Sequence, residues 1–437
     1  MQDLATLRSG GYRGRGLQKL KLSEPLNGFP REILDLADTL EYLDLSGTGL
    51  STLPEDFSQL QKLNIAFFSD CHFTVFPKQL AACPELEMVA FRSNAMTAIP
   101  EGALPFNLRW LILTNNRIEA LPESIGRCSR LQKCMLAGNS LTTLPDGMSA
   151  CHKLGLLRLS ANNFAELPPW LFELPELAFL SVAGNPCCAV SLDEELALLR
   201  KVGWHDLEIG SLLGHGASGD IFKARWVVAD SVVEQVAVKL FKGEVTSDGT
   251  PLDEMAACLA AGSHGNLIST LASIQGHPEK HGLIMQLIPL ITRLLAFRLH
   301  CRPTDKPLSL ETVLEILRGV AAAARHLHSR KVSHCDLYAH NILFNETGHA
   351  LLGDFGAATI YEHLDGFDFE KLEVLALGHL VEDMLGLVNV KEEDSKGQKV
   401  LQELRMLHTR CSTPIVRARP TFAEVVGGMQ AATRECQ

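Results

Sequence analysis

Four polar side chains in the second half of the chain could act together on a phosphorylated ligand. Lys239 lies in an apolar, strand-like run, where a lysine needs an anionic partner. Asp336 and Asn341 belong to the segment H-C-D-L-Y-A-H-N (334–341), and Asp354 begins the triplet D-F-G. An ammonium can steady phosphates, carboxylate and amide oxygens can hold Mg²⁺, and a carboxylate can accept the proton of a hydroxyl. These residue types suit phosphoryl transfer, which needs positioning and charge neutralisation.

A glycine-rich segment and an acidic helix precede these residues. Gly214, Gly216 and Gly219 would let a backbone hairpin lie close over nucleotide phosphates, although a plain turn would also explain the pattern. Glu254, on the helix-like stretch 252–261, could pair with Lys239. Asp253 and Glu244 are alternatives, and a solvated surface carboxylate is the simpler interpretation of any of them.

These motifs are very unlikely to occur together by chance in this order and at this spacing. Residues 207–437 resemble the protein kinase family, which implies a small strand-rich lobe, a larger helical lobe and a cleft for ATP and Mg²⁺ between them. The amphipathic stretch 311–329 is expected to be a helix.

By the same resemblance, Asp336, Lys239 and Asn341 would be catalytic, and Asn341 and Asp354 would hold the metal. The nucleotide would be bound by Gly214, Gly216, Gly219, Lys239, Glu254 and a hinge of Met285, Gln286, Leu287 and Ile288.

Several positions depart from the family pattern. Cys335 replaces an arginine that pairs with a phosphorylated activation segment, so phosphorylation is not expected to be the on-switch. Tyr338 replaces the lysine usual in serine/threonine kinases, which leaves the acceptor open, with Ser/Thr favoured over Tyr. Glu373 replaces the aspartate that opens the long helix of the large lobe. The 16 residues between Gly356 and Glu373 contain no A-P-E triplet, so the substrate platform is expected to be unusual.

Three hypotheses follow for the second half. The leading one is an active, ATP-dependent protein kinase, because Lys239, Asp336, Asn341 and Asp354 are all present. The alternative is a catalytically weak pseudokinase that acts as a scaffold for protein interaction, which the unusual residues favour. A phosphotransferase acting on small molecules is the third.

The first half is a repeat array. Prolines that follow an apolar residue recur at intervals of 24, 23, 23, 22, 23 and 23 residues, and asparagines recur in phase with them. Residues 17–190 resemble bacterial-type leucine-rich repeats, which implies a solenoid whose units share one core. The prolines are 30, 54, 77, 100, 122, 145 and 168, and the asparagines are 94, 116, 139, 162 and 185.

Two columns of strand residues are expected to face the concave side of the solenoid. Aromatic and apolar residues dominate both, which favours binding of a protein substrate or partner there. The simpler interpretation is that these side chains pack on one another or on the second half. The first column is Tyr42, Ile65, Met88, Trp110, Lys133, Leu156 and Phe179, and the second is Asp44, Phe67, Ala90, Ile112, Met135, Arg158 and Ser181.

Length and composition fit two domains. We expect a leucine-rich-repeat domain over 1–204, closed by a capping helix over 191–201, and a kinase domain over 205–437. The net charge of −11 argues against nucleic-acid binding, and no apolar run reaches membrane-spanning length. The twelve cysteines form no C-x-x-C pair and several recur with the repeats, so they are expected to be reduced, mostly buried thiols. The first residues lack an export signal, which favours a cytoplasmic protein.

Overall fold

The chain divides into two compact units. The computed structural model describes residues 2–188, 200–216, 218–229, 232–242, 245–246, 248–288, 293–295, 308–364, 366–388, 391 and 394–434. One unit comprises residues 1–177 and 185–187, and the other comprises residues 178–184 and 188–437. The predicted boundary at 204/205 stays a prediction. Residues 191–199 of the expected capping helix lie outside the described residues, and Lys201, its expected last residue, begins strand β9 (Lys201–Gly203).

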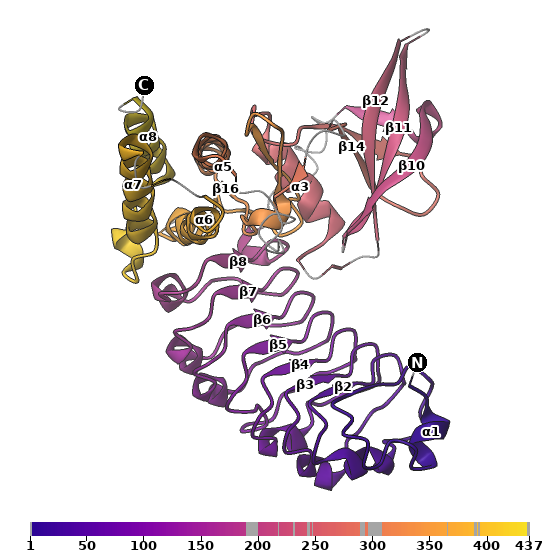
Figure 1. Cartoon of the computed structure of the whole chain (residues 1–437). Coiled ribbons are helices and arrows are strands. Elements are labelled where there is room, and N and C mark those ends of the chain that lie inside the picture. The colour runs from indigo at the N-terminus through magenta and orange to yellow at the C-terminus, as the bar shows by residue number, and fades with distance from the viewer. Residues whose placement is uncertain are drawn as a thin grey trace. The chain divides into compact units, whose positions relative to one another are not determined.

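Short strands follow one another in chain order and form an eight-stranded sheet (Figure 1). The pairings from β1 to β7 are parallel, so equivalent residues of successive repeats lie side by side, as in Trp110 opposite Lys133. After the helix α1 (Leu4–Arg8), the strands are β1 (Lys19–Lys21), β2 (Tyr42–Asp44), β3 (Ile65–Phe67), β4 (Met88–Ala90), β5 (Trp110–Ile112), β6 (Lys133–Met135), β7 (Leu156–Arg158) and β8 (Phe179–Ser181).

A proline begins most of the 3-10 helices that lie between the strands. Proline fixes φ near the helical value and needs no amide partner, so it suits the start of a short helix. Pro100 is the exception, because the described residues 91–109 form no helix, and Phe106 in this repeat is 61% exposed. The 3-10 helices are η1 (Arg31–Leu36), η2 (Glu55–Gln59), η3 (Lys78–Ala82), η4 (Glu123–Arg127), η5 (Asp146–Ala150), η6 (Pro169–Glu173) and η7 (Pro186–Cys188).

The central residue of each strand points into a shared core. Leu43, Ala66, Val89, Leu111, Cys134 and Leu157 are all completely buried. Cysteines between the strands are also buried, as the sequence predicts, and desolvation raises the pKa of Cys83 to about 12, of Cys128 to about 12 and of Cys151 to about 11. The expected solenoid is therefore confirmed.

The asparagines satisfy backbone groups that the solenoid buries. Asn139 accepts a hydrogen bond from the amide of Ile118 (3.0 Å) and donates to the carbonyls of Leu113 (3.0 Å) and Leu136 (2.9 Å). Asn116 and Asn162 make the equivalent bonds one repeat away on either side. Each asparagine thus joins consecutive turns through groups that would be costly to leave unpaired.

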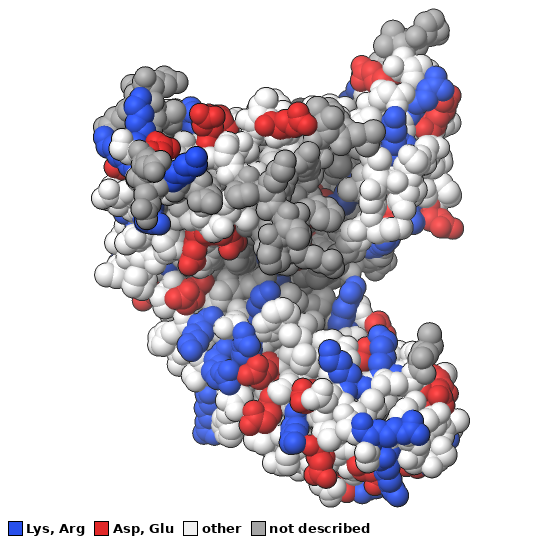
Figure 2. Space-filling model, viewed as in Figure 1, with Lys and Arg blue, Asp and Glu red and all other residues white. Residues whose placement is uncertain are grey.

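The expected exposure of the two strand columns is only partly correct. Residues of the first column are half-buried, but Asp44, Ala90, Arg158 and Ser181 of the second column are buried. Asp44 is held below the surface because its carboxylate pairs with Lys21 (2.7 Å) and accepts from the amide of Ser46 (3.0 Å). On the face seen in Figure 2, Lys and Arg are interspersed with Asp and Glu.

The smaller lobe of the second unit is a six-stranded sheet with one helix. Its strand order is β10-β11-β12-β14-β13-β9, and its first four strands are antiparallel neighbours. After η8 (Trp204–Asp206), the remaining elements are β10 (Leu207–His215), β11 (Gly219–Ala229), β12 (Val232–Phe241), α3 (Pro251–Ala261), β13 (Thr270–Gln275) and β14 (Gly282–Gln286).

The larger lobe is helical. The stretch expected to be a helix over 311–329 is α5, which Ser309 caps by accepting from the amide of Thr312 (3.1 Å). None of the helices in the described ranges is both long and apolar enough to cross a membrane. The elements are β15 (Arg293–Leu294), α5 (Leu310–Ser329), β16 (Val332–Ser333), η9 (Ala339–Asn341), β17 (Ile342–Phe344), β18 (Ala350–Leu352), β19 (Thr359–Ile360), α6 (Phe369–Leu385), α7 (Ser395–Cys411), η10 (Val416–Ala418) and α8 (Phe422–Arg434).

Replacing Asn139 by alanine should lower the free energy of unfolding of the repeat unit by about 2 kcal/mol or more. The change leaves the buried amide of Ile118 and two buried carbonyls without this partner, and each such group costs about 1–3 kcal/mol. Urea titration followed by peptide-resolved hydrogen exchange measures the effect. Asn163→Ala, one residue after the equivalent asparagine and exposed, is the control. Equal losses in both variants would contradict the proposed role of the ladder.

Candidate functional site

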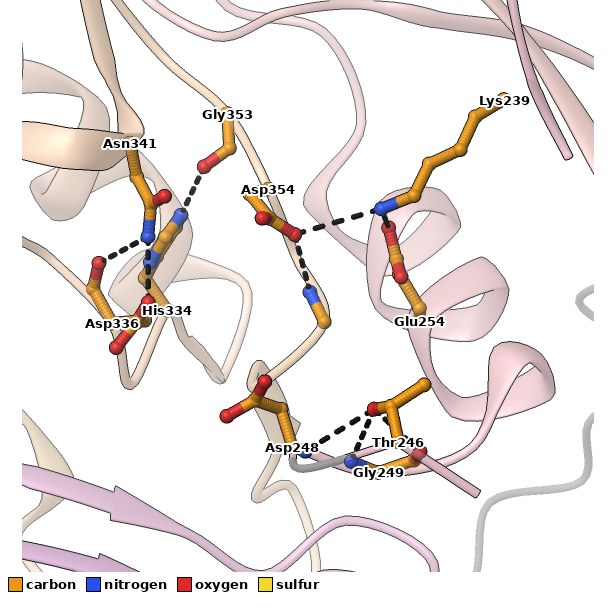
Figure 3. A network of polar contacts seen from close by, with 11 residues as sticks. Lys239, Thr246, Asp248, Gly249, Glu254, His334, Asp336, Asn341, Gly353 and Asp354 are labelled. Atoms are coloured by element: carbon orange, nitrogen blue, oxygen red, sulfur yellow. Dashed lines mark hydrogen bonds and ion pairs between the residues drawn. The ribbon is translucent and has the colours of Figure 1, made fainter. Parts of the chain in front are cut away.

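A buried ammonium group connects the two lobes of the second unit. Lys239 comes from β12, and its Nζ lies 2.6 Å from Oε1 of Glu254 on α3 and 3.6 Å from Oδ1 of Asp354 in the larger lobe (Figure 3). The Lys239 and Glu254 side chains are almost completely buried, whereas the side chain of Asp354 is 55% exposed. One carboxylate therefore fixes the lysine, and the other remains open to a ligand.

The start of helix α3 selects which acidic residue meets the lysine. Thr250 caps the helix by accepting from the amide of Asp253 (3.2 Å), and its hydroxyl donates to the carboxylate of the same residue (2.6 Å). Asp253 is thus bound to the cap, and Glu254, one position further around the helix, faces Lys239. The other alternative, Glu244, lies outside the described residues.

The local charges keep the lysine protonated and Asp354 ionised. Burial would lower the pKa of Lys239, but the carboxylates of Glu254 and Asp354 outweigh it and raise that pKa. Partial desolvation would raise the pKa of Asp354, and the charge of Lys239 together with the amide of Gly356 lowers it instead. Both groups therefore carry full charge at neutral pH.

Asp336 and Asn341 lie together in the larger lobe. The amide nitrogen of Asn341 donates to the carboxylate of Asp336 (2.7 Å) and to its backbone carbonyl (2.9 Å), so the Asn341 amide oxygen points away from these bonds (Figure 3). The ring of His334 bonds the carbonyl of Gly353 at 2.9 Å. This bond connects the segment carrying Asp336 to the segment carrying Asp354.

The glycine-rich segment forms the expected hairpin between β10 and β11. The amide of Gly216 donates to the carbonyl of Gly219 at 2.8 Å, and Gly214 is paired with Ile221. A side chain at Gly219 would meet the carbonyl of Leu240 at 2.6 Å, so this position requires glycine. The hairpin is held at its base by Asp220, which accepts from His215 (2.7 Å) and pairs with Lys242 (2.5 Å).

A cavity brings many, but not all, of the predicted residues together. Its lining includes Gly216, Gly219, Lys239, Glu254, Met285, Asn341 and Asp354, together with His340, which the sequence suggests as a substitute for the lysine missing at Tyr338. Ser218, Cys258 and Thr270 also line it, and the sequence did not single them out for this role. Gly214, Asp336, Gln286, Leu287 and Ile288 are not part of this lining. The amide of Gln286 donates to the carbonyl of Ser269 (2.9 Å), so the protein itself already uses that amide.

The polar groups of the cavity fit a nucleotide and magnesium. Lys239 supplies a positive charge for phosphate oxygens, and Asp354 and Asn341 offer oxygen donors of the kind that Mg²⁺ prefers. Within the described part of the chain no three His, Cys, Asp or Glu side chains form a metal cluster. Two protein donors suit Mg²⁺, which takes its other oxygens from phosphates and water.

Comparison with known proteins agrees with this arrangement. Residues 207–370 match the family model described as protein tyrosine and serine/threonine kinase, and residues 39–60 and 106–164 match leucine-rich repeat models. Family members generally use ATP and Mg²⁺.

Individual relatives include both classes of kinase. The megakaryocyte-associated tyrosine-protein kinase of Rattus norvegicus is 32% identical over 43% of this chain and 37% of its own length. The tyrosine-protein kinase receptor TYRO3 of Gallus gallus is 28% identical over 38% of this chain and 20% of its own length. A probable serine/threonine-protein kinase of Dictyostelium discoideum is 28% identical over 36% of this chain and 9% of its own length.

The match covers less than two fifths of each of these relatives. The matched residues 207–370 nevertheless contain Lys239, Glu254, Asp336, Asn341 and Asp354, the side chains that the fold arranges at the site. The chain therefore carries leucine-rich repeats in its first half and a protein kinase domain in its second half.

Proposed function

We infer that this protein is an active kinase that transfers the γ-phosphoryl group of ATP to a hydroxyl of a protein. One observation carries the inference: Lys239 is held between Glu254 and Asp354, while Asn341 lines the same cavity and is bonded to Asp336. Keeping so many ionic groups close together is costly unless they serve a task. A protein kinase is the function that these groups support best.

The proposed roles follow from the chemistry of each group. Lys239 would hold phosphate oxygens, and Asn341 and Asp354 would hold Mg²⁺ through their side-chain oxygens. Bound ATP with its metal supplies an activated phosphoryl group. Asp336 would accept the proton of the substrate hydroxyl, and its bond from Asn341 would orient the carboxylate. Backbone amides near Gly214, Gly216 and Gly219 would cover the phosphates, and Met285 to Ile288 would contact the adenine.

The acceptor is proposed to be serine or threonine. The relatives include kinases of both classes, so they do not decide the question. Tyr338 is 41% exposed, and the centroid of its ring lies 4.8 Å from that of the His340 ring. His340 also lines the cavity. This pair would take the place of the lysine expected in serine/threonine kinases. A cytoplasmic location stays a prediction from the sequence.

Replacing Asp336 by asparagine should reduce phosphoryl transfer by at least about 100-fold, because loss of a general base typically costs 10²–10⁴-fold. The measurement is transfer of label from ATP to a general protein substrate in the presence of Mg²⁺. Glu346→Gln, an exposed acidic residue of the same lobe, should leave the rate unchanged.

If the wild-type protein transferred no label, the scaffold hypothesis would be favoured, provided that ATP still raised its melting temperature. Transfer to metabolites but not to proteins would favour a small-molecule phosphotransferase. Either outcome would contradict the proposed activity on proteins.

Replacing Glu254 by alanine should lower the local stability around β12 and α3 by about 3 kcal/mol, because the change leaves the buried ammonium of Lys239 without its closest partner. Hydrogen exchange of peptides from these elements, in increasing urea, measures the effect. Glu208→Ala is the matched control, since Glu208 pairs with Arg225 at the surface and should matter by less than about 1 kcal/mol. A comparable loss in both variants would mean that burial of the ion pair is unimportant.

We further propose that the first strand column of the repeats binds a protein partner or substrate. Tyr42, Ile65, Met88, Trp110 and Leu156 are half-buried and occupy equivalent positions on paired strands. The ammonium of Lys133 lies 4.1 Å from the ring centroid of Trp110, which keeps this part of the column amphipathic. Aromatic residues of this kind are frequent at the centre of protein interfaces.

The double variant Trp110→Ala, Leu156→Ala should reduce recovery of partner proteins at least about tenfold, because large side chains at an interface centre carry most of the binding energy. The measurement is affinity capture from a cell lysate with quantitative mass spectrometry. Phe106→Ala removes an aromatic residue that is 61% exposed but outside the strands, and it should leave recovery unchanged. Equal recovery with all variants would exclude this face.

A further inference from the structure

The segment that follows the D-F-G triplet contains two hydroxyl-bearing residues, and neither is accessible. Within residues 357–372 these are Thr359 and Tyr361. Thr359 is completely buried and Tyr361 is 8% exposed. A kinase acting on this segment in the observed conformation would therefore find no hydroxyl to modify. The segment must be held in place by contacts other than those of a phosphate.

Tyr361 is fixed through contacts of its ring and through its backbone. Its ring stacks on Phe369 of α6 at 5.0 Å and 19°, and the ammonium of Lys331 lies 5.7 Å from its centroid. Its amide donates to the carbonyl of Lys331 (2.9 Å). The preceding residues pair with β16, with Ile360 opposite Val332. Tyr361 thus directly follows β19, which pairs this segment with β16 just before the catalytic loop (residues 334–341).

The hydroxyl of Tyr361 begins a chain of buried hydrogen bonds. It lies 2.8 Å from Nδ1 of His328, the next-to-last residue of α5. The other ring nitrogen, Nε2, lies 2.6 Å from Oε2 of Glu373 on α6. An ionised carboxylate can only accept, so Nε2 donates to Glu373. The Tyr361 hydroxyl is bonded to Nδ1 and also lies 3.4 Å from the backbone carbonyl of His328. The ring of Phe422 stacks on the ring of His328 (5.3 Å between centroids, 16°).

Glu373 carries the chain of bonds to the residues that precede Asp336. Its carboxylate accepts from the amide of Cys335 (2.7 Å) and from the amide of His334 (3.2 Å). Burial would raise the pKa of Glu373, but its bonds to His328 and its other donors lower it, so the group stays ionised. Burial and the nearby charge of Glu373 raise the pKa of Tyr361, which keeps its hydroxyl protonated and able to donate.

The cysteine at position 335, in place of the family's arginine, explains why hydrogen bonds from Tyr361 to this loop are useful. An arginine there could bind a phosphate on the activation segment, whereas the Cys335 side chain is buried and its thiol donates to the carbonyl of Ser333 (3.5 Å). The residue at position 335 therefore supplies no positive charge for a phosphate. The neutral hydroxyl of Tyr361 is connected to the same loop through His328 instead.

We propose that Tyr361 is a positioning residue that holds the activation segment against the catalytic loop through His328 and Glu373, without phosphorylation. The inference deepens the proposed kinase function and rests on it where turnover is concerned. The contacts themselves do not depend on the reaction. Tyr361 thus orders the activation segment through a hydrogen bond that needs no modification. In kinases switched by phosphorylation, a phosphate orders this segment.

Tyr361→Phe tests the proposal, because it keeps the ring packing and removes the hydroxyl. We expect amide exchange of residues 357–364 to accelerate about tenfold in the nucleotide-free protein, since a buried ring nitrogen loses its partner. We also expect kcat to fall about fivefold while the KM for ATP stays unchanged. Tyr12→Phe, which removes a hydroxyl that accepts from the amide of Asp3 in the repeat unit, should alter neither quantity.

A second variant shows whether the residues act as one network. His328→Gln interrupts the same chain of bonds, so the double variant with Tyr361→Phe should exchange no faster than the more affected single variant. Phosphatase treatment of the wild-type protein should leave kcat unchanged within about twofold, because no phosphate is needed.

The outcomes separate this inference from the proposed function. If the wild-type protein transfers no phosphate, the proposed function fails and the exchange experiment still tests the network. The network is excluded if Tyr361→Phe changes neither exchange nor kcat, or if it accelerates exchange evenly over α5, α6 and the segment. Loss of activity on removal of a phosphate from Thr359 or Tyr361 would also overturn the proposal.

Discussion

The second unit is organised around the buried ammonium group of Lys239. Lys239 can remain charged there because Glu254 neutralises it directly and Asp354 lies slightly further away. Removing either partner of a buried pair is far more costly than breaking a surface pair. The position of α3 against the sheet, and of the D-F-G segment against both, is therefore constrained by one charge. The groups that would meet a nucleotide are arranged before it binds.

The repeat unit obeys the same rule with neutral groups. Its strands are three residues long, and the turns between them carry buried backbone amides and carbonyls. Asparagine provides both a donor and an acceptor, and Asn139 uses both to join consecutive turns. In both units, the cost of an unpaired polar group selects the residue type more strictly than apolar packing does.

The sequence predicts features that repeat or that follow a fixed chemical order. The proline and asparagine periods indicate the solenoid, and the family models and the sheet confirm it. The fold of the second unit is also confirmed. Glu254 and Asp253 could not be separated from sequence, because the choice depends on which of them bonds the helix cap at Thr250.

Other features depend on contacts between residues far apart in the chain. Tyr361 and His328 are 33 positions apart and carry no motif that would connect them, although Glu373 was recognisable as unusual. The burial of Asp44 depends on a lysine one strand away. The proline at position 100 matches those of the other repeats, yet no helix follows it in the described residues 101–109 and Phe106 is exposed. Tertiary contacts of this kind leave no local pattern.

The reactivity of the buried cysteines of the solenoid would report local opening of the repeats. Cys83, Cys128 and Cys151 occupy equivalent places in different repeats and are almost completely enclosed. Their raised pKa values, about 12, 12 and 11, leave almost no thiolate at neutral pH, and the thiolate is the form that reacts. A thiol reagent would consequently modify each one during excursions that expose it. The order in which they are alkylated would reveal which end of the array unravels first, without any probe being introduced.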